Sequence, residues 1–321
     1  MRLRLLPAFL IALSSLSAAH AQTTPAGKAE FEVASIRPSG PLDTAEIRAR
    51  IAAGQMPRFG VHIDGLSAEY LRMPLRALIS RAYDVQGFQI TVPKDINTEP
   101  FDITARMPEG STRDDERAML LNLLEHRFHL QATRSNDETP VFDLTVGKGG
   151  PKLKESATRL QPIDPATELK PNQIKQESLL GTMIETRNPD HSVLIDMGEK
   201  GKLTEKADPQ TRAVLISGTA TIPALATLLT QLETGGPMAD HGGRPIVDAT
   251  GLKGAYDISL ELSMNTMSEG QRSASGTEAT DPAGSMGLDE SLAKMGLKLE
   301  PGKAPIPHVT VTHIDKMPTE N

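Results

Sequence analysis

The sequence contains no cysteine and no tryptophan, and aromatic residues make up only 3% of its 321 residues. Without cysteine there is no disulfide bond, no thiolate metal site, no cysteine nucleophile and no cysteine-linked lipid anchor. The scarcity of aromatic rings argues against a surface that grips bases or sugars by stacking. The fold must therefore be held together by its apolar core, for which a chain of this length is sufficient.

Positive charge is also scarce, and no segment forms a basic block. Lysine and arginine total 34 against 41 acidic residues, which gives a formal net charge of −7. An acidic chain of this kind is repelled by phosphate backbones and by anionic lipid surfaces. We therefore expect no nucleic-acid partner.

Residues 1–21 have the pattern of a signal peptide. Arg2 and Arg4 precede a mostly apolar run over 5–16, and Ala-His-Ala at 19–21 has the small-x-small form that signal peptidase reads. An N-terminal membrane anchor is the alternative, but the run is shorter than the roughly 20 residues that span a bilayer. We expect export to the periplasm or beyond, with cleavage after Ala21 and no stable membrane insertion afterwards.

Two phrases far apart in the chain nearly repeat each other. They are EPFDITARM at 99–107 and GAYDISLEL at 254–262. Around each phrase the pattern predicts a strand, a helix with proline in its first turn (Pro74 or Pro223), two strands, a helix and two further strands. The sequence therefore predicts an α+β fold of two related β-α-β-β-α-β-like units that arose by internal duplication.

This pattern also suggests boundaries. We place the first unit at 28–150, a polar linker or insertion at 151–210 with local order near SVLID, and the second unit at 211–321. Within the second unit, residues 264–287 are rich in Ser, Gly, Thr and acids, which is typical of a disordered loop.

The repeated phrases make a further prediction about their side chains. Strand alternation puts Phe101 and Tyr256 on a buried face and Asp102 and Asp257 on the opposite face. The simpler interpretation of the two aspartates is that they face solvent. If the units pack about a pseudo-two-fold axis, however, both carboxylates could lie near it.

Longer phrases, spread in order over most of the chain, carry a family resemblance. They are FEVASIRPS, MPLRALISRAYDV, FDITARMPEG, LLNLLEHRFHLQATR, VFDLTVGKGGPKLKES, GRPIVDATGLKGAYDISLEL and GLKLEPGKAPIPHVTVTHIDKMPTEN. Together they resemble the exported, soil-associated proteins of the DUF3738 family. The departures from the family pattern lie near Thr44 and over about 174–206.

The resemblance implies an exported protein and names no activity. Similar domains occur attached to membrane metallopeptidases of the beta-lactam-sensing type, which implies at most a role in envelope sensing. The repeated pattern is also similar to the small N-terminal domains of secretins and TonB-dependent receptors, which bind other proteins. That second likeness is a fold-level analogy and does not establish function.

The histidines offer weak metal candidates. His126 and His129, beside Glu125, are three residues apart at the end of a predicted helix, whereas helical zinc sites use a spacing of four. His308 and His313 are five apart in a predicted strand and so face opposite sides. For both pairs we expect capping or surface roles.

Other motifs have ordinary structural explanations. GKGGPK at 147–152 lacks the Ser or Thr and the helix of a phosphate loop, so it indicates a turn after a strand. HGGRP at 241–245 is a loop leading into a strand, or a small basic nest for an anion. Asp114 and Asp115 open a predicted helix, where capping explains them. No GxSxG or SxxK motif places a serine nucleophile.

From these observations we predict a non-enzymatic binding or interaction module of the cell envelope. The alternative is an envelope hydrolase or metal-dependent enzyme without a recognisable motif. We assign no catalytic, cofactor-binding or metal-ligating residue and expect no cofactor. The partner, an envelope protein or a ligand, is not specified by the sequence.

Overall fold

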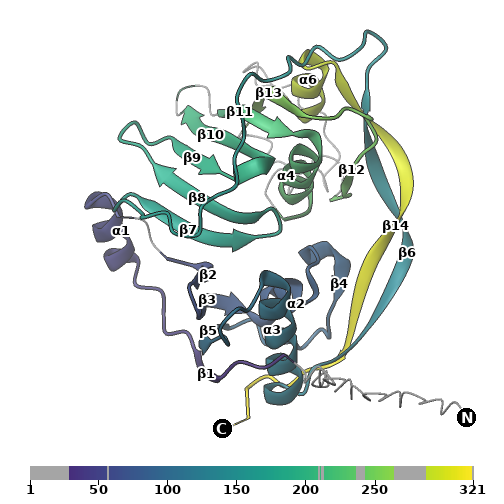
Figure 1. Ribbon diagram of the computed structural model, residues 1–321. Helices are drawn as coiled ribbons and strands as arrows, with labels where there is room; N and C mark the ends of the chain where they lie inside the picture. The colour runs from purple at the N-terminus through teal and green to yellow at the C-terminus, as the bar shows by residue number, and fades with distance from the viewer. Residues whose placement is uncertain are drawn as a thin grey trace, which may run out of the picture.

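The computed structural model describes residues 29–55, 58–208, 210, 213–235, 243–263 and 287–319. The signal-peptide prediction for 1–21 and nearly all of the loop predicted at 264–287 lie outside these residues. The described chain forms two lobes, one above the other in Figure 1, connected along one side by a long two-stranded ribbon.

The lower lobe packs helices against a four-stranded portion of sheet. Its strands are β1 (Val33–Pro38), β2 (Gly60–Asp64), β3 (Ser67–Pro74) and β5 (Pro100–Arg106), and the helices packed on them are α2 (Leu75–Tyr83) and α3 (Arg113–Arg127). A further helix, α1 (Thr44–Ala52), has no buried residue. A 3-10 turn, η1 (Gly87–Gln89), leads into the short strand β4 (Ile90–Thr91). Asp43 caps α1 by accepting hydrogen bonds from the backbone of Ala45 and Glu46.

The upper lobe has a larger portion of the same sheet. Its strands are β7 (Gln173–Ser178), β8 (Gly181–Arg187), β9 (Val193–Asp196), β10 (Gly201–Asp208), β11 (Ala213–Thr221) and β13 (Ala255–Ser263). A 3-10 turn, η2 (Gly198–Lys200), precedes β10. The helices are α4 (Ile222–Gly235) and α6 (Leu288–Lys294), and the short strand β12 (Ile246–Asp248) lies beside the ribbon.

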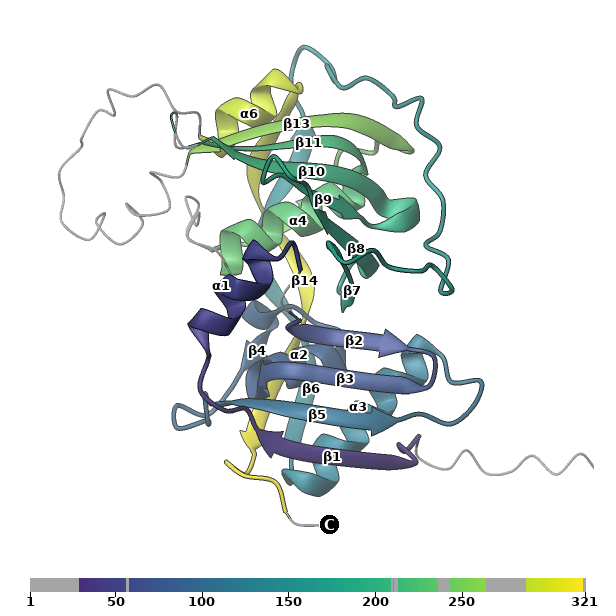
Figure 2. The ribbon, with the colours of Figure 1, turned by 90° about the vertical axis from the view of Figure 1, so that its left-hand side faces the viewer.

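One ten-stranded sheet runs through both lobes in the order β1-β5-β3-β2-β7-β8-β9-β10-β11-β13. Figure 2 shows these strands stacked from β1 at the bottom to β13 at the top. Residues 173–208, which we expected to lie in a polar linker, form four of these strands. The expectation failed because short antiparallel strands with one solvated face bury only a few apolar residues, here Ile174, Ile184 and Leu203.

The ribbon consists of β6 (Gln131–Val146) and β14 (Leu297–His313), paired antiparallel along nearly their whole length. We predicted two separate strands in each of these regions. The middle of β6 is polar and lacks the alternation of a half-buried strand, but its backbone is paired with β14, so the strand continues. Each end of the ribbon belongs to a different lobe, and β12 and β4 extend it to a four-stranded sheet.

Two separate apolar cores lie at the two ends of the ribbon. Phe101 is fully buried in the lower core, as predicted, and its ring meets the edge of Phe128 at 5.2 Å between centroids. Tyr256, which we expected to be equally buried, is only half-buried. Its hydroxyl donates to the backbone oxygen of Lys253 at the surface, so this ring lies at the margin of the upper core.

Candidate binding site at the seam between the lobes

The two lobes of the ten-stranded sheet meet where β2 runs beside β7, a place we call the seam. Only one residue pair, Val61 with Glu177, is in ladder register there. Because directly opposed residues share a face of a sheet, Glu177 lies on the same face as Val61, which belongs to the lower core. His62, the next residue, points to the opposite face.

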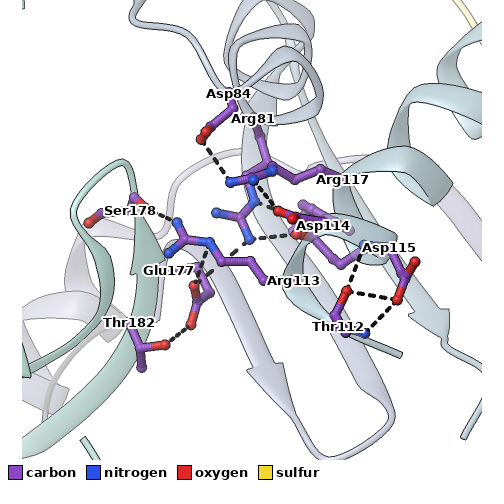
Figure 3. Close-up of polar contacts among 12 residues, drawn as sticks. Arg81, Asp84, Thr112, Arg113, Asp114, Asp115, Arg117, Glu177, Ser178 and Thr182 are labelled. Carbon is purple, nitrogen blue, oxygen red and sulfur yellow. Dashed lines mark hydrogen bonds and ion pairs between the residues drawn. The ribbon is translucent and has the colours of Figure 1, made fainter. Parts of the chain in front are cut away.

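Glu177 is a buried carboxylate that brings together groups from both lobes. Its Oε2 atom lies 3.5 Å from Arg113 Nε and 3.8 Å from Arg81 Nη2, and its Oε1 atom accepts a hydrogen bond from Thr182 at 2.6 Å. Figure 3 shows the two arginines reaching Glu177 from the lower lobe while Thr182 and Ser178 approach from the upper lobe. The carboxylate therefore links α2 and α3 to the turn between β7 and β8.

Arg81 also binds a second buried carboxylate, Glu116. Its Nε and Nη2 atoms lie 3.3 Å and 2.5 Å from the two Glu116 oxygens, and the Tyr70 hydroxyl donates to Glu116 as well. Burial, reinforced by the Glu116 charge, raises the pKa of Tyr70 well above its ordinary value of 10.0. Burial alone would lower the pKa of Arg81, but Glu116 and Glu177 outweigh it and raise that pKa. At neutral pH the arginine is therefore charged and the tyrosine is protonated.

The turn between β7 and β8 fits closely against Arg113. The Arg113 guanidinium donates to the backbone oxygen of Ser178. Gly181 in this turn has φ +99°, and a Cβ atom on it would lie 3.1 Å from Arg113 Nη1, so both conformation and space favour glycine. We call Tyr70, Arg81, Arg113, Glu116 and Glu177 together the seam ion cluster.

On the other face of the sheet, His62 is buried to 96%. Its Nδ1 atom lies 2.7 Å from the Lys175 backbone oxygen, so this nitrogen carries a proton and Nε2 is left as an acceptor. Burial, aided by the nearby Arg58 charge, lowers the pKa of His62 below 6.5. Nε2 has no hydrogen-bond partner within the described chain.

His62 lines a cleft of about 630 Å³, which we call the seam cleft. One wall comes from the lower lobe, including Arg58 and Asp64, and the other comes from residues 165–175, including Lys170 and Lys175. Arg58 is paired with Glu69 at 2.6 Å, and Lys175 lies 3.7 Å from Asp64. The cleft thus combines a neutral imidazole acceptor with charges of both signs, which suits a polar ligand that carries a hydrogen-bond donor.

The histidines singled out from the sequence do not reach the seam. His126 Nδ1 bonds the Asn122 backbone oxygen at 2.9 Å, as expected for a residue at a helix end. His129 and His313 both contact Asp315, at 2.7 Å and 3.1 Å, on the exposed surface. His308 instead bonds Thr91 Oγ1 at 2.8 Å. Among the described residues no group of three or more His, Asp or Glu has an arrangement that could hold a metal ion.

The GKGGPK turn and the acidic start of α3 have the structural roles predicted for them. The 147–152 segment is a turn after β6, in which the Gly150 N–H donates to the Gly147 oxygen at 2.9 Å. Thr112 and Asp115 form a capping box at the start of α3, and Asp114 pairs with Arg117. In the 241–245 motif, His241 and the following glycine lie outside the described residues, and Pro245 leads into β12.

The structure places the two aspartates of the repeated phrases far apart in the sheet. Asp102 is on β5, the second strand from one end, and Asp257 is on β13, the last strand at the other end. They do not meet near a common axis. Asp102 is also not a free surface residue, because its Oδ1 atom accepts hydrogen bonds from Ser39 and from the Arg72 backbone.

Sequence reasoning missed both His62 and Glu177. His62 had one available signal, a histidine between Val61 and Ile63 in a segment predicted to be a strand, where alternation sets it apart from its apolar neighbours. Glu177 had none, because it lies in the segment interpreted as a linker and its two arginine partners are more than 60 positions away.

Comparison with known proteins adds a family but no activity. A family model described as a protein of unknown function, DUF3738, matches residues 76–314, well over half of the chain. No curated protein and no solved structure gives a significant match. None of the described helices combines the length and apolar character needed to cross a membrane. On the family match, this chain belongs to the DUF3738 family.

Proposed function

We propose that this protein is an exported, non-enzymatic binding module of the bacterial cell envelope and that the seam cleft holds its ligand. The observation that carries the proposal is His62, a residue that lines the cleft and whose buried Nε2 atom has no hydrogen-bond partner within the described chain. A buried polar atom without a partner is costly, and a ligand donor that reaches it would remove that cost.

The two lobes both contribute to this cleft, so a ligand there would contact β2 and β7 together. On the opposite face of the sheet, the seam ion cluster fixes how the lobes meet, because Glu177 of β7 is held by arginines from α2 and α3. At the seam the lobes are held by one ladder pair and by the buried ion cluster. A ligand in the cleft would add further contacts between the two lobes there. This arrangement supports binding coupled to the packing of the lobes.

Export is supported by the basic, apolar and small-x-small segments of residues 1–21. Duplication is supported by element order, because β3-α2-β4-β5-α3-β6 in the first half has the same order as β11-α4-β12-β13-α6-β14 in the second. In addition, β4 pairs in parallel with β14 and β12 pairs in parallel with β6, so each half supplies its last strand to the other. We also propose that each repeated unit is similar in fold to the small N-terminal domains of secretins and TonB-dependent receptors.

The test uses nitrogen-15-labelled protein and a panel of small amines, amides and polyols, all of which carry hydrogen-bond donors. At least one compound should shift the His62 Nε2 resonance in the nuclear magnetic resonance spectrum. The same compound should not bind His62→Asn, which keeps a donor for the Lys175 oxygen but lacks Nε2. The matched control is His308→Asn, which is outside the cleft and should bind normally. If no compound perturbs His62, the seam cleft is not the binding site.

A further inference from the structure

Within the described part of the chain, the edge of the ten-stranded sheet at β1 has unpaired backbone groups. β1 pairs with β5 on one side, and no other described strand pairs with it. The Ser39 N–H donates to the Pro100 oxygen at 2.8 Å, which makes these two residues a hydrogen-bonded pair. Because such pairs alternate along an antiparallel ladder, the N–H groups of Ala34 and Ile36 point away from β5, toward the open edge. Figure 2 shows β1 as the lowest strand of the sheet.

A groove of about 460 Å³ lies beside the first half of this edge. One side is formed by residues 30–34, and the other by α3 through Met119, Asn122, Leu123 and His126. The groove therefore offers apolar contacts from two α3 side chains, a side-chain amide and an imidazole. A chain that paired with β1 would place alternate side chains along this groove.

Asn122 gives the groove an unmet hydrogen-bond requirement. The residue is 92% buried and lines the groove, and its Nδ2 atom has no acceptor within the described chain. Its backbone oxygen is already used by His126 Nδ1 at 2.9 Å. An amide donor of this kind, next to a strand edge, matches a carbonyl oxygen of an adjacent extended backbone.

We propose that the β1 edge and this groove dock an extended peptide segment of a partner protein, which adds to the sheet as an eleventh strand. Its backbone pairs with Ala34 and Ile36, a carbonyl oxygen accepts from Asn122, and an apolar side chain contacts Met119 and Leu123. This surface is on the opposite side of the lower sheet from the seam, so the inference does not depend on a ligand in the seam cleft.

A second copy of this chain fits the same edge less well. Pairing β1 with β1 through Ala34 and Ile36 would bring Pro38 of the second copy opposite residue 32, beside the groove. Proline has no N–H and no polar side-chain atom, so it contributes no side-chain partner to the groove and its backbone cannot donate to the edge. A peptide of unrelated sequence has no such restriction.

The test selects a phage-displayed library of random short peptides against the purified full chain. Selected peptides should slow hydrogen exchange of the Ala34 and Ile36 amides. Ala34→Pro removes one outward N–H and leaves the ladder to β5 intact, so it should weaken binding about tenfold or more with little change in melting temperature. Asn122→Leu, which removes the amide in a side chain of similar size, should weaken binding as well.

His62→Asn serves as the matched control and should bind the selected peptides normally, which separates this surface from the seam cleft. The inference is overturned if the library yields no binder, or if the selected peptides bind Ala34→Pro and Asn122→Leu as tightly as the original protein. It is also overturned if sedimentation shows a dimer of the original protein that Ala34→Pro dissociates, because the occupant of the edge is then a second copy.

Discussion

The Oδ1 atom of Asp102 accepts a hydrogen bond from the backbone N–H of Arg72 at 2.9 Å, across the ladder between β5 and β3. The register of that ladder shifts between Tyr70 and Met73, and Arg72 has φ +56° within the irregularity. A non-glycine residue in this conformation is strained unless its surroundings hold it. The carboxylate of Asp102 thus fixes a β-bulge immediately before α2.

Asp102→Ala should therefore destabilise the protein by about 1–3 kcal/mol, because the bulge loses its acceptor and Ser39 loses a partner. Asp257→Ala, at the exposed position in the second phrase, should change stability by about 0.5 kcal/mol or less. Urea unfolding of both variants measures the difference. Adding Arg72→Gly to Asp102→Ala should recover part of the loss, since glycine adopts positive φ without strain. Equal effects of the two alanine variants would contradict this role of Asp102.

The aromatic residues of the two phrases should differ as well. Phe101→Ala should cost about 3–5 kcal/mol, because the ring is fully buried against Phe128. Tyr256→Ala should cost clearly less, because that ring is half-buried. Tyr256→Phe should have almost no effect, since its hydroxyl bonds a backbone oxygen at the surface. Thermal and urea unfolding would show this order, and similar losses for both alanine variants would mean that Tyr256 is a core residue.

Local patterns in the sequence were enough to identify most elements of the fold. The α+β class is confirmed, Asp114 and Asp115 lie in the first turn of α3 as predicted, and Phe101 is buried. These features depend on neighbours within a few positions. The domain boundaries stay a prediction. Within the linker expected at 151–210, residues 173–208 form strands of the sheet. The sequence did not reveal them because these strands bury few apolar residues.

The candidate site could not be predicted in the same way, because its residues are brought together by pairing between distant segments. Glu177 meets Arg81 and Arg113 only because β7 pairs with β2, and no pattern near Glu177 indicates that pairing. The continuity of β6 through its polar middle likewise depends on β14, more than 150 positions later. Non-local pairing of this kind leaves no local periodicity to detect.

Tyr70 makes the protein sensitive to alkaline pH. Its pKa is raised in the folded state by burial and by Glu116, whereas the unfolded chain titrates near 10.0. The folded state therefore binds the Tyr70 proton more tightly than the unfolded chain does. The stabilisation that protonated Tyr70 provides is fully present below pH 10 and is lost as the pH rises toward the higher folded pKa. Tyr70→Phe should flatten the fall of melting temperature above pH 10. Tyr83, whose pKa is also raised, remains in both proteins and accounts for a residual slope.

His62 has the opposite pH dependence. Its folded pKa is lowered by burial and by Arg58, so below pH 6.5 the unfolded chain binds a proton more readily than the folded chain. Stability should therefore be full above pH 6.5 and should fall as the pH drops below it. His62→Asn, which cannot titrate, should reduce this loss in acid unfolding curves, whereas His308→Asn should not. An unchanged acid profile in His62→Asn would mean that His62 is not buried in its neutral form.

Glu177 provides the sharpest test of how the lobes are joined. Glu177→Ala leaves Arg113 and Thr182 without their buried partner, so we expect a loss of about 3–5 kcal/mol in the free energy of unfolding. Glu46→Ala is the matched control, because it breaks an exposed pair with Arg50 in α1 and should cost less than about 1 kcal/mol.

Hydrogen exchange then identifies which strands lose stability in this variant. In Glu177→Ala, backbone amides of β2, β7 and β8 should exchange faster, because β2 and β7 meet at the seam through a single ladder pair and Thr182 of β8 loses its bond to Glu177. Amides of α4 and β11, in the upper core, should change little. Uniform acceleration across both lobes would show that Glu177 supports the whole fold. Unchanged exchange at β2 and β7 would show that the ribbon of β6 and β14 is enough to hold the lobes together.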